Sequence, residues 1–127
     1  MKYALIVTQD VMLEGRLRTG LPHYGVGVCV VHSLADASRE LRTSHPTAVV
    51  MDLPWDRGWS QSMGSWLVRN VRMHGIRVVL TARTPLARDL KTAFPVGEAE
   101  FLPPTFNLAD LAEAVEPGVD VESPVAA

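Results

Sequence analysis

The stretch Thr47-Ala48-Val49-Val50-Met51-Asp52-Leu53-Pro54 decides the fold of this chain. Four apolar residues run into a single carboxylate, Asp52, and Pro54 then breaks the strand because it has no backbone N–H to donate. A near-continuous apolar run is typical of a strand that is buried on both faces of a parallel sheet. We therefore predict a strand at residues 47–53 that carries Asp52 to the carboxyl edge of the sheet, where open α/β sheets bind their ligands.

The rest of the chain alternates apolar strands with amphipathic helices. Strands are predicted at residues 3–8, 26–32, 76–81 and 99–102. Helices are predicted at residues 10–21, from Ser33 to His45, at 60–74, from Thr84 to Phe94, and from Asn107 onward. Five β-α units predict an α/β fold with a doubly wound parallel sheet, flavodoxin-like (βα)5, with strand order 2-1-3-4-5 and a cleft where the first and third strands end.

Helix boundaries and buried faces follow from particular residue types. Asp10, Ser33 and Asn107 are predicted N-caps, and Gly75 is predicted as the residue that ends the third helix. Apolar side chains that recur at helical spacing are expected to face the core. They are Leu13, Leu17 and Leu21; Leu34, Ala37 and Leu41; Met63, Leu67 and Val71, with Trp66 beside them; Leu86, Leu90 and Phe94; and Leu108, Leu111, Ala112 and Val115.

Composition places the chain among ordinary globular domains. The 127 residues are 47% hydrophobic and 20% charged, with a net charge of −2, which is not the basic excess that nucleic-acid binding needs. Residues 1–116 are predicted to form one domain, and residues 117–127, which lack periodicity, a flexible tail or the start of a linker. The single cysteine, Cys29, lies in an apolar run and is expected to be a buried, inert thiol. With no membrane-length apolar run, the protein is predicted to be cytoplasmic.

Over residues 1–116 the chain resembles the receiver domain of bacterial response regulators, the CheY-like superfamily. The resemblance is carried by Asp52 after the third strand, by Leu80-Thr81-Ala82 after the fourth, by Phe101 in the fifth strand followed by Phe106, and by the β-α rhythm. It implies that Asp52 stands at the phosphoacceptor position, that Thr81 and Phe101 stand at switch positions, that two acids after the first strand would hold Mg²⁺, and that a lysine after the fifth strand would pair with the phosphate.

The sequence departs from this pattern where the charged groups are expected. The acid-pair position reads Thr8-Gln9, both neutral, and Asp10 comes one residue late. The lysine position falls on Pro104. A single electrostatic group of this kind contributes roughly 3 kcal/mol to a transition state, so the loss of three of five should be severe. We therefore predict a pseudo-receiver that works without conventional Mg²⁺-dependent phosphorylation of Asp52. No metal or cofactor is assigned. Asp52 alone is a poor Mg²⁺ site, to which Asp10 or Asp56 would add a second carboxylate through bridging waters.

Function is then expected to lie in protein–protein interaction. In the resembling family the face of the fourth helix, fifth strand and last helix commonly forms dimers or docks partners, and here it includes Arg88, Lys91, Phe101, Asp110 and Glu113. The loop after Asp52 offers a second candidate surface in Trp55, Arg57 and Trp59. A competing interpretation is that the tryptophans pack locally and the arginines are solvated at the surface. A third interpretation is that Arg57 or Arg83 neutralises Asp52 directly. The acidic excess of residues 98–127 is either a solvated helix and tail or a docking face.

Two other functions stay open. One is a phosphorylatable receiver in which a histidine kinase transfers phosphate to Asp52. The other is a small-molecule binder such as an FMN protein, although Thr8-Gln9-Asp10-Val11-Met12 lacks the Ser/Thr/Gly-rich phosphate cradle of that class. No hydrolase elbow, Cys–His dyad or metal-ligand histidine spacing is present, so the chain is not predicted to be an enzyme. No binding to nucleic acid or membrane is expected.

Overall fold

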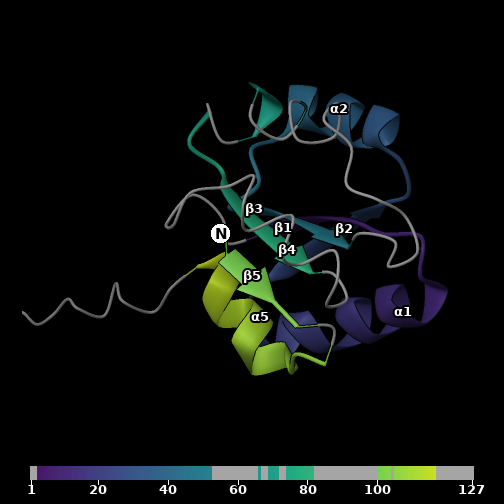
Figure 1. Ribbon diagram of the computed structural model, residues 1–127, viewed down its shortest axis with the longest axis vertical. Coiled ribbons are helices and arrows are strands. Elements are labelled where there is room, and N and C mark those ends of the chain that lie inside the picture. The colour runs from purple at the N-terminus through teal and green to yellow at the C-terminus, as the bar shows by residue number, and fades with distance from the viewer. Residues whose placement is uncertain are drawn as a thin grey trace, which may run out of the picture.

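The computed structural model describes residues 3–52, 66, 69–71, 74–81, 100–103 and 105–116. Within these ranges five parallel strands form one sheet in the order β2-β1-β3-β4-β5, which confirms the predicted strand order (Figure 1). The strands are β1 (Tyr3–Val7), β2 (Gly27–Val31), β3 (Ala48–Asp52), β4 (Arg77–Thr81) and β5 (Glu100–Leu102). The described helices are α1 (Val11–Gly20), the 3₁₀ turn η1 (Leu21–Tyr24), α2 (Leu34–Thr43) and α5 (Leu108–Val115).

The predicted N-caps Asp10, Ser33 and Asn107 are confirmed, and a fourth, Thr84, lies outside the described residues. The side chain of Asp10 accepts the backbone N–H groups of Met12 and Leu13, that of Ser33 accepts from Asp36, and that of Asn107 accepts from Asp110. Each bond satisfies a backbone donor that has no partner within its helix. α1, α2 and α5 therefore begin directly after the short polar residues that cap them.

Two glycines end helical segments with a backbone that other residues rarely adopt. Gly75 has a φ of 76°, which confirms its predicted role at the end of the third helix. Gly25 has a φ of 79° and closes η1, where its N–H reaches the carbonyls of Leu21 and Pro22. Sequence periodicity did not predict η1, because a single 3₁₀ turn is too short to show a repeat.

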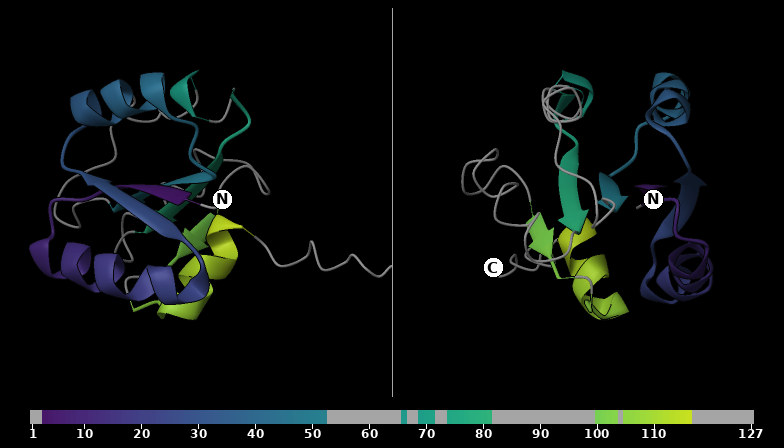
Figure 2. Two further views of the ribbon diagram at one scale, coloured as in Figure 1. Left: turned by 180° about the vertical axis from the view of Figure 1, so that it is seen from behind. Right: turned by 45° about the vertical axis from the view of Figure 1, so that its right-hand side comes forward.

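The core has two halves, one on each face of the sheet. Figure 2 shows α2 over one face and α1 with α5 over the other. The half beneath α2 contains Leu5, Val49, Met51 and Leu80, with Ala37 and Val71 from the helical side. The half against α1 and α5 contains Ile6, Val50, Val79 and Phe106, with Leu17, Leu21, Leu111 and Val115 from the helices. Both faces of the central strands are thus covered, which explains their unbroken apolar sequence.

The third helix is described only in part. Val71 is fully buried, and Trp66 packs against the core and donates its indole N–H to Ser38 of α2 at 2.8 Å. Predicted core positions Met63, Leu67, Leu86, Leu90 and Phe94 lie outside the described residues, as do residues 117–127.

One burial prediction needs correction. Cys29 lies on β2, the outer strand of the sheet, and is only half-buried, because no further strand among the described residues lies beside it. Desolvation, followed by the nearby Glu40 carboxylate, raises the pKa of the Cys29 thiol, so the expectation of low reactivity agrees with its surroundings. In the part of the chain that the structure describes, no helix is long and apolar enough to cross a membrane.

Candidate functional site at the carboxyl edge of the sheet

Three polar side chains gather where the central strands end. Asp52 is the last residue of β3 and lies in register with Thr81 of β4. Thr8 follows β1, whose Val7 is paired with Met51, so Thr8 lies beside Asp52. By the alternation of side chains along a strand, all three are on the face that α1 and α5 cover. Thr8 and Thr81 are almost fully buried, with 2% and 3% of their surface exposed.

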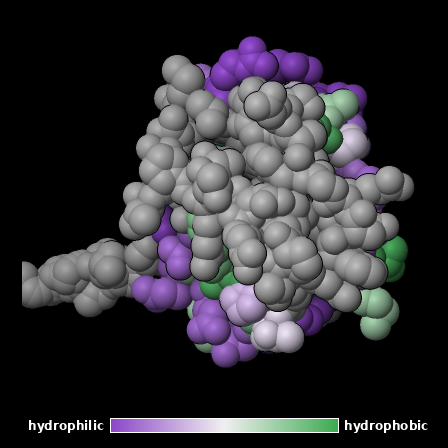
Figure 3. Space-filling view, viewed as in Figure 1, coloured by the Kyte–Doolittle hydropathy of each residue, from purple (hydrophilic) through white to green (hydrophobic). Residues whose placement is uncertain are grey.

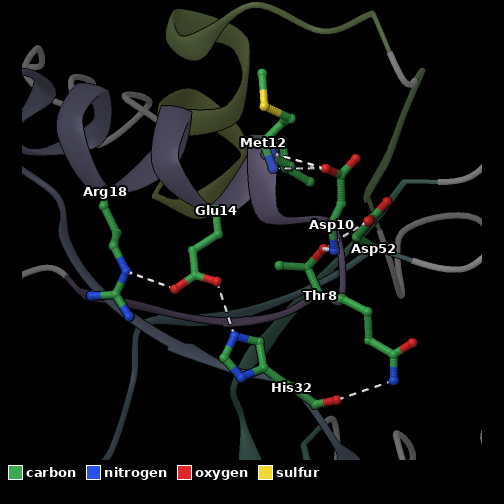
Figure 4. Close-up of polar contacts among 9 residues, drawn as sticks. Thr8, Asp10, Met12, Glu14, Arg18, His32 and Asp52 are labelled. Atoms are coloured by element: carbon green, nitrogen blue, oxygen red, sulfur yellow. Dashed lines mark hydrogen bonds and ion pairs between the residues drawn. The ribbon is translucent and has the colours of Figure 1, made fainter.

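Thr8 connects Asp52 to the start of α1. Its hydroxyl donates to Oδ2 of Asp52 at 2.8 Å, and the backbone N–H of Asp10 donates to the same hydroxyl oxygen at 3.0 Å (Figure 4). A hydroxyl that accepts one hydrogen bond becomes a better donor in the next, and the buried position strengthens both. Asp52 is therefore held by a neutral donor at a place where the resemblance implies a second carboxylate.

The other two polar residues of this loop point elsewhere. Oδ1 of Asp10 accepts the N–H groups of Met12 and Leu13 at 3.0 and 3.1 Å. The side-chain amide of Gln9 donates to the backbone carbonyl of His32, just past the end of β2, at 3.4 Å. Asp10 serves as a helix cap, as predicted, and Gln9 extends toward the neighbouring edge strand.

Besides the Gln9 bond, a cluster of charged side chains forms a second link between α1 and the residue after β2. One carboxylate oxygen of Glu14 lies 2.9 Å from Nε2 of His32, and the other accepts from Nε of Arg18 at 3.0 Å (Figure 4). The hydrogen bond from His32, followed by that from Arg18, lowers the pKa of Glu14. The group is exposed, so it fixes geometry more than it stabilises the fold.

A second cation reaches the far side of the same edge. Arg16 of α1 donates from Nη2 to the backbone carbonyl of Phe106 at 2.6 Å and lies over the Phe106 ring, 5.2 Å from its centroid. Phe106 closes a turn after β5 by donating its N–H to the carbonyl of Pro103. Pro104, which occupies the family's lysine position, lies outside the described residues.

Of the two candidate partner surfaces, the loop after Asp52 lies outside the described residues and the other surface is described only in part. Trp55, Arg57, Trp59, Arg83, Arg88 and Lys91 lie outside the described residues. Phe101 is half-buried and packs against the α2 half of the core, on the sheet face opposite to α5. Hydrophilic residues gather over α2 and over α5 (Figure 3), and the exposed charges include Arg39 and Arg42 on α2 and Asp110 and Glu113 on α5.

Among the described residues, the polar side chains of the loop after β1 make hydrogen bonds within the protein. Mg²⁺ prefers one or two carboxylates together with water and substrate phosphate. Thr8 directs its hydrogen at Asp52, Gln9 is bonded to His32, and Oδ1 of Asp10 is taken up by two backbone donors. Within the described ranges, no group of three or more His, Cys, Asp or Glu side chains is placed to hold a metal.

Two features of the site did not emerge from the sequence. In the sequence Thr8 stands out only as a neutral residue at an acid position, although the adjacency of the first and third strands places it beside Asp52, to which its hydroxyl donates. The contact between Arg16 and Phe106 joins residues 90 positions apart, and no local pattern indicates it.

Comparison with known proteins places the fold among receiver domains. No protein-family model matches the chain, and no curated protein matches it by sequence. A response regulator receiver protein from Sinorhizobium medicae superposes with a TM-score of 0.70 at 20% identity, covering 90% of both chains. The receiver domain of a histidine kinase from Syntrophus aciditrophicus gives 0.74 at 19% identity, covering 98% of this chain and 95% of its own.

A third similar structure was solved with its metal. It is the receiver domain of a sensor histidine kinase from Pseudomonas aeruginosa, with a magnesium ion coordinated in its active site cleft. It superposes with a TM-score of 0.70 at 17% identity and covers 90% of this chain and 93% of its own. At these identities the similarity establishes a shared fold, and the residues of the site must decide the function.

Proposed function

We propose that this chain, which has the fold of response regulator receiver domains, is a pseudo-receiver: a protein-interaction module of bacterial signal transduction that does not use Mg²⁺-dependent phosphorylation of Asp52. One observation carries the proposal, namely the hydrogen bond from the Thr8 hydroxyl to Oδ2 of Asp52. It puts a neutral donor where the phosphorylation chemistry needs a carboxylate that binds metal.

The electrostatic reasoning is direct. Phosphoryl transfer to a carboxylate brings two negative groups together, so a metal ion and a cation must neutralise the charge that builds up on the phosphoryl oxygens. Thr8 and Gln9 supply no charge, and Asp10 is engaged as a helix cap. The described residues thus preserve the position of Asp52 without the means to bring a phosphoryl group to it.

Phosphorylation of Asp52 remains the competing function, and one observation favours it. Asp52 and Thr81 lie in register at the same edge, the relation that the resemblance implies for a phosphoacceptor and its hydroxyl partner. Incubation with acetyl phosphate and Mg²⁺, followed by intact-mass measurement, separates the two functions. The pseudo-receiver gains no phosphoryl mass. A gain in mass in the wild type that is absent from Asp52→Asn establishes the competing function instead.

Partner docking is tested by charge reversal on the two helix layers. The proposed docking side contains Arg88, Lys91 and the exposed acids of α5, Asp110 and Glu113. We expect Arg88→Glu with Lys91→Glu, or Asp110→Lys with Glu113→Lys, to reduce co-purification of a partner. The matched control is Arg39→Glu with Arg42→Glu on α2, which lies over the sheet face opposite to α5. Equal loss in all three variants, or loss in the control alone, contradicts this placement.

A further inference from the structure

Arg16 joins α1 to the residue that immediately precedes the cap of α5. Its guanidinium donates to the carbonyl of Phe106 at 2.6 Å and at the same time lies over the ring of that residue. A planar guanidinium can make both contacts, whereas a lysine ammonium has no flat face to stack. The ring itself is 3% exposed and packs with Leu17 and Leu111, so Arg16 contacts a residue that is already fixed in the core.

Phe106 sets the position at which α5 begins. Its N–H closes the turn after β5 on the carbonyl of Pro103 at 3.0 Å. The next residue, Asn107, caps α5 by accepting the N–H of Asp110 at 2.8 Å. A displacement of Phe106 would therefore displace the first turn of α5.

The N-terminal end of α1 is tied to Asp52. The hydroxyl of Thr8 bonds Asp52 and accepts the N–H of Asp10, whose carboxylate in turn caps α1. Arg16 lies on α1 six residues after this cap, which is less than two turns along the helix. A continuous series of bonds thus runs from Asp52 through Thr8, Asp10 and α1 to Arg16 and the start of α5.

We propose that Arg16 couples the Asp52 edge to α5 through α1. This route uses neither Thr81 nor Phe101, the positions to which the resemblance assigns the switch. Phe101 in fact packs on the sheet face opposite to α5. The proposal rests on the proposed function only in regarding α5 as part of the docking side; the coupling itself is a property of the folded chain and is measured without a partner.

Amide exchange and chemical shifts in the full chain test the coupling. Arg16→Met keeps an apolar stem but removes both contacts with Phe106, and Arg18→Met is the matched control on the same helix, since Arg18 pairs with Glu14. We expect exchange of the α5 amides, measured relative to those of β1, to accelerate about tenfold in Arg16→Met, as for the loss of a charge-assisted hydrogen bond. Arg18→Met should leave that ratio unchanged.

A second experiment tests whether a substitution at Thr8 changes the environment of α5 through Arg16. Thr8→Val should shift the amides of Leu111 and Ala114 in the wild-type background and leave them unshifted in the Arg16→Met background. Equal shifts in both backgrounds, or none in the wild type, overturn the proposal. If Arg16→Met does not fold, Arg16→Lys, which keeps the charge but loses the planar group, takes its place with the same two outcomes.

The two proposals fail separately. Phosphorylation of Asp52 would overturn the proposed function and leave the Arg16 result standing. Unchanged exchange rates and chemical shifts of the α5 amides in these variants would overturn the coupling and leave the proposed function standing.

Discussion

Thr8 changes the chemistry of the sheet edge by replacing a charge with a hydrogen-bond donor. It is almost completely buried and lies between the backbone N–H of Asp10 and the carboxylate of Asp52. A second carboxylate here would repel Asp52 unless a cation lay between them. A hydroxyl needs no such cation, so Thr8 can donate to Asp52 directly.

The strength of the hydrogen bond between Thr8 and Asp52 can be measured by substituting the two residues. In a double-mutant cycle of Thr8→Val and Asp52→Ala, we expect a coupling energy of about 1.5–3 kcal/mol, the contribution of a hydrogen bond to a charged group. Urea unfolding of the four proteins gives the value. Thr8→Ser, which keeps the hydroxyl, is the control and should retain the coupling to Asp52. A coupling near zero would mean that the bond contributes nothing in solution.

The carboxylate of Glu14 should make the stability of the fold depend on pH. Its hydrogen bonds to His32 and Arg18 lower its pKa in the folded protein below the usual 4.5. A lowered pKa means that the contribution to stability is present above about pH 4.5 and is lost as the pH falls through the folded value. NMR titration of the Glu14 carboxyl carbon should show an upward shift of its pKa in His32→Gln that exceeds the shift in Arg18→Met, because the His32 bond is the largest cause. The reverse order would contradict this assignment.

At the level of elements, α1 is the helix that connects the parts of the site. Its cap contacts the Asp52 network, Glu14 bonds to His32 past the end of β2, and Arg16 reaches the turn before α5. Its C-terminal end lies against α5, where Gly20 faces Leu108. A helix with contacts at both ends and in the middle is expected to move as one body.

Two glycines of α1 should respond differently to alanine. A Cβ at Gly15 would meet open space, so Gly15→Ala should raise the free energy of unfolding by about 0.5–1 kcal/mol through helix propensity. A Cβ at Gly20 would overlap Cδ1 of Leu108, so Gly20→Ala should lose that gain to the displacement of Leu108. Thermal unfolding of both variants is the measurement. A Gly20→Ala protein as stabilised as Gly15→Ala would show that α1 and α5 are not closely packed.

For the whole molecule, the sequence predicted what depends on local pattern. Apolar runs predicted all five strands, and Asp10, Ser33 and Asn107 predicted the starts of three helices, because each signal lies within a few residues of its effect. The position of Asp52 at the carboxyl edge followed from the order of the elements.

Contacts between distant segments could not be predicted in the same way. The bond between Thr8 and Asp52 spans 44 positions, and that between Arg16 and Phe106 spans 90. The Arg16 contact depends on how α1 and α5 lie on the sheet, for which the sequence carries no signal, whereas the Thr8 bond follows once the first and third strands are placed side by side. The half-burial of Cys29, by contrast, follows from the predicted strand order, which already puts its strand at an edge of the sheet.

If the proposed function is right, Asp52 does not take part in Mg²⁺-dependent phosphoryl chemistry. The most direct test is to titrate the ¹⁵N-labelled full chain with Mg²⁺ and then with beryllofluoride, which mimics the phosphoryl group on a carboxylate, while following the backbone amides of Thr8, Asp52 and Thr81. The predicted result is that these amides do not move in the wild-type protein. A saturable shift centred on Asp52, abolished by Asp52→Asn, would contradict the claim.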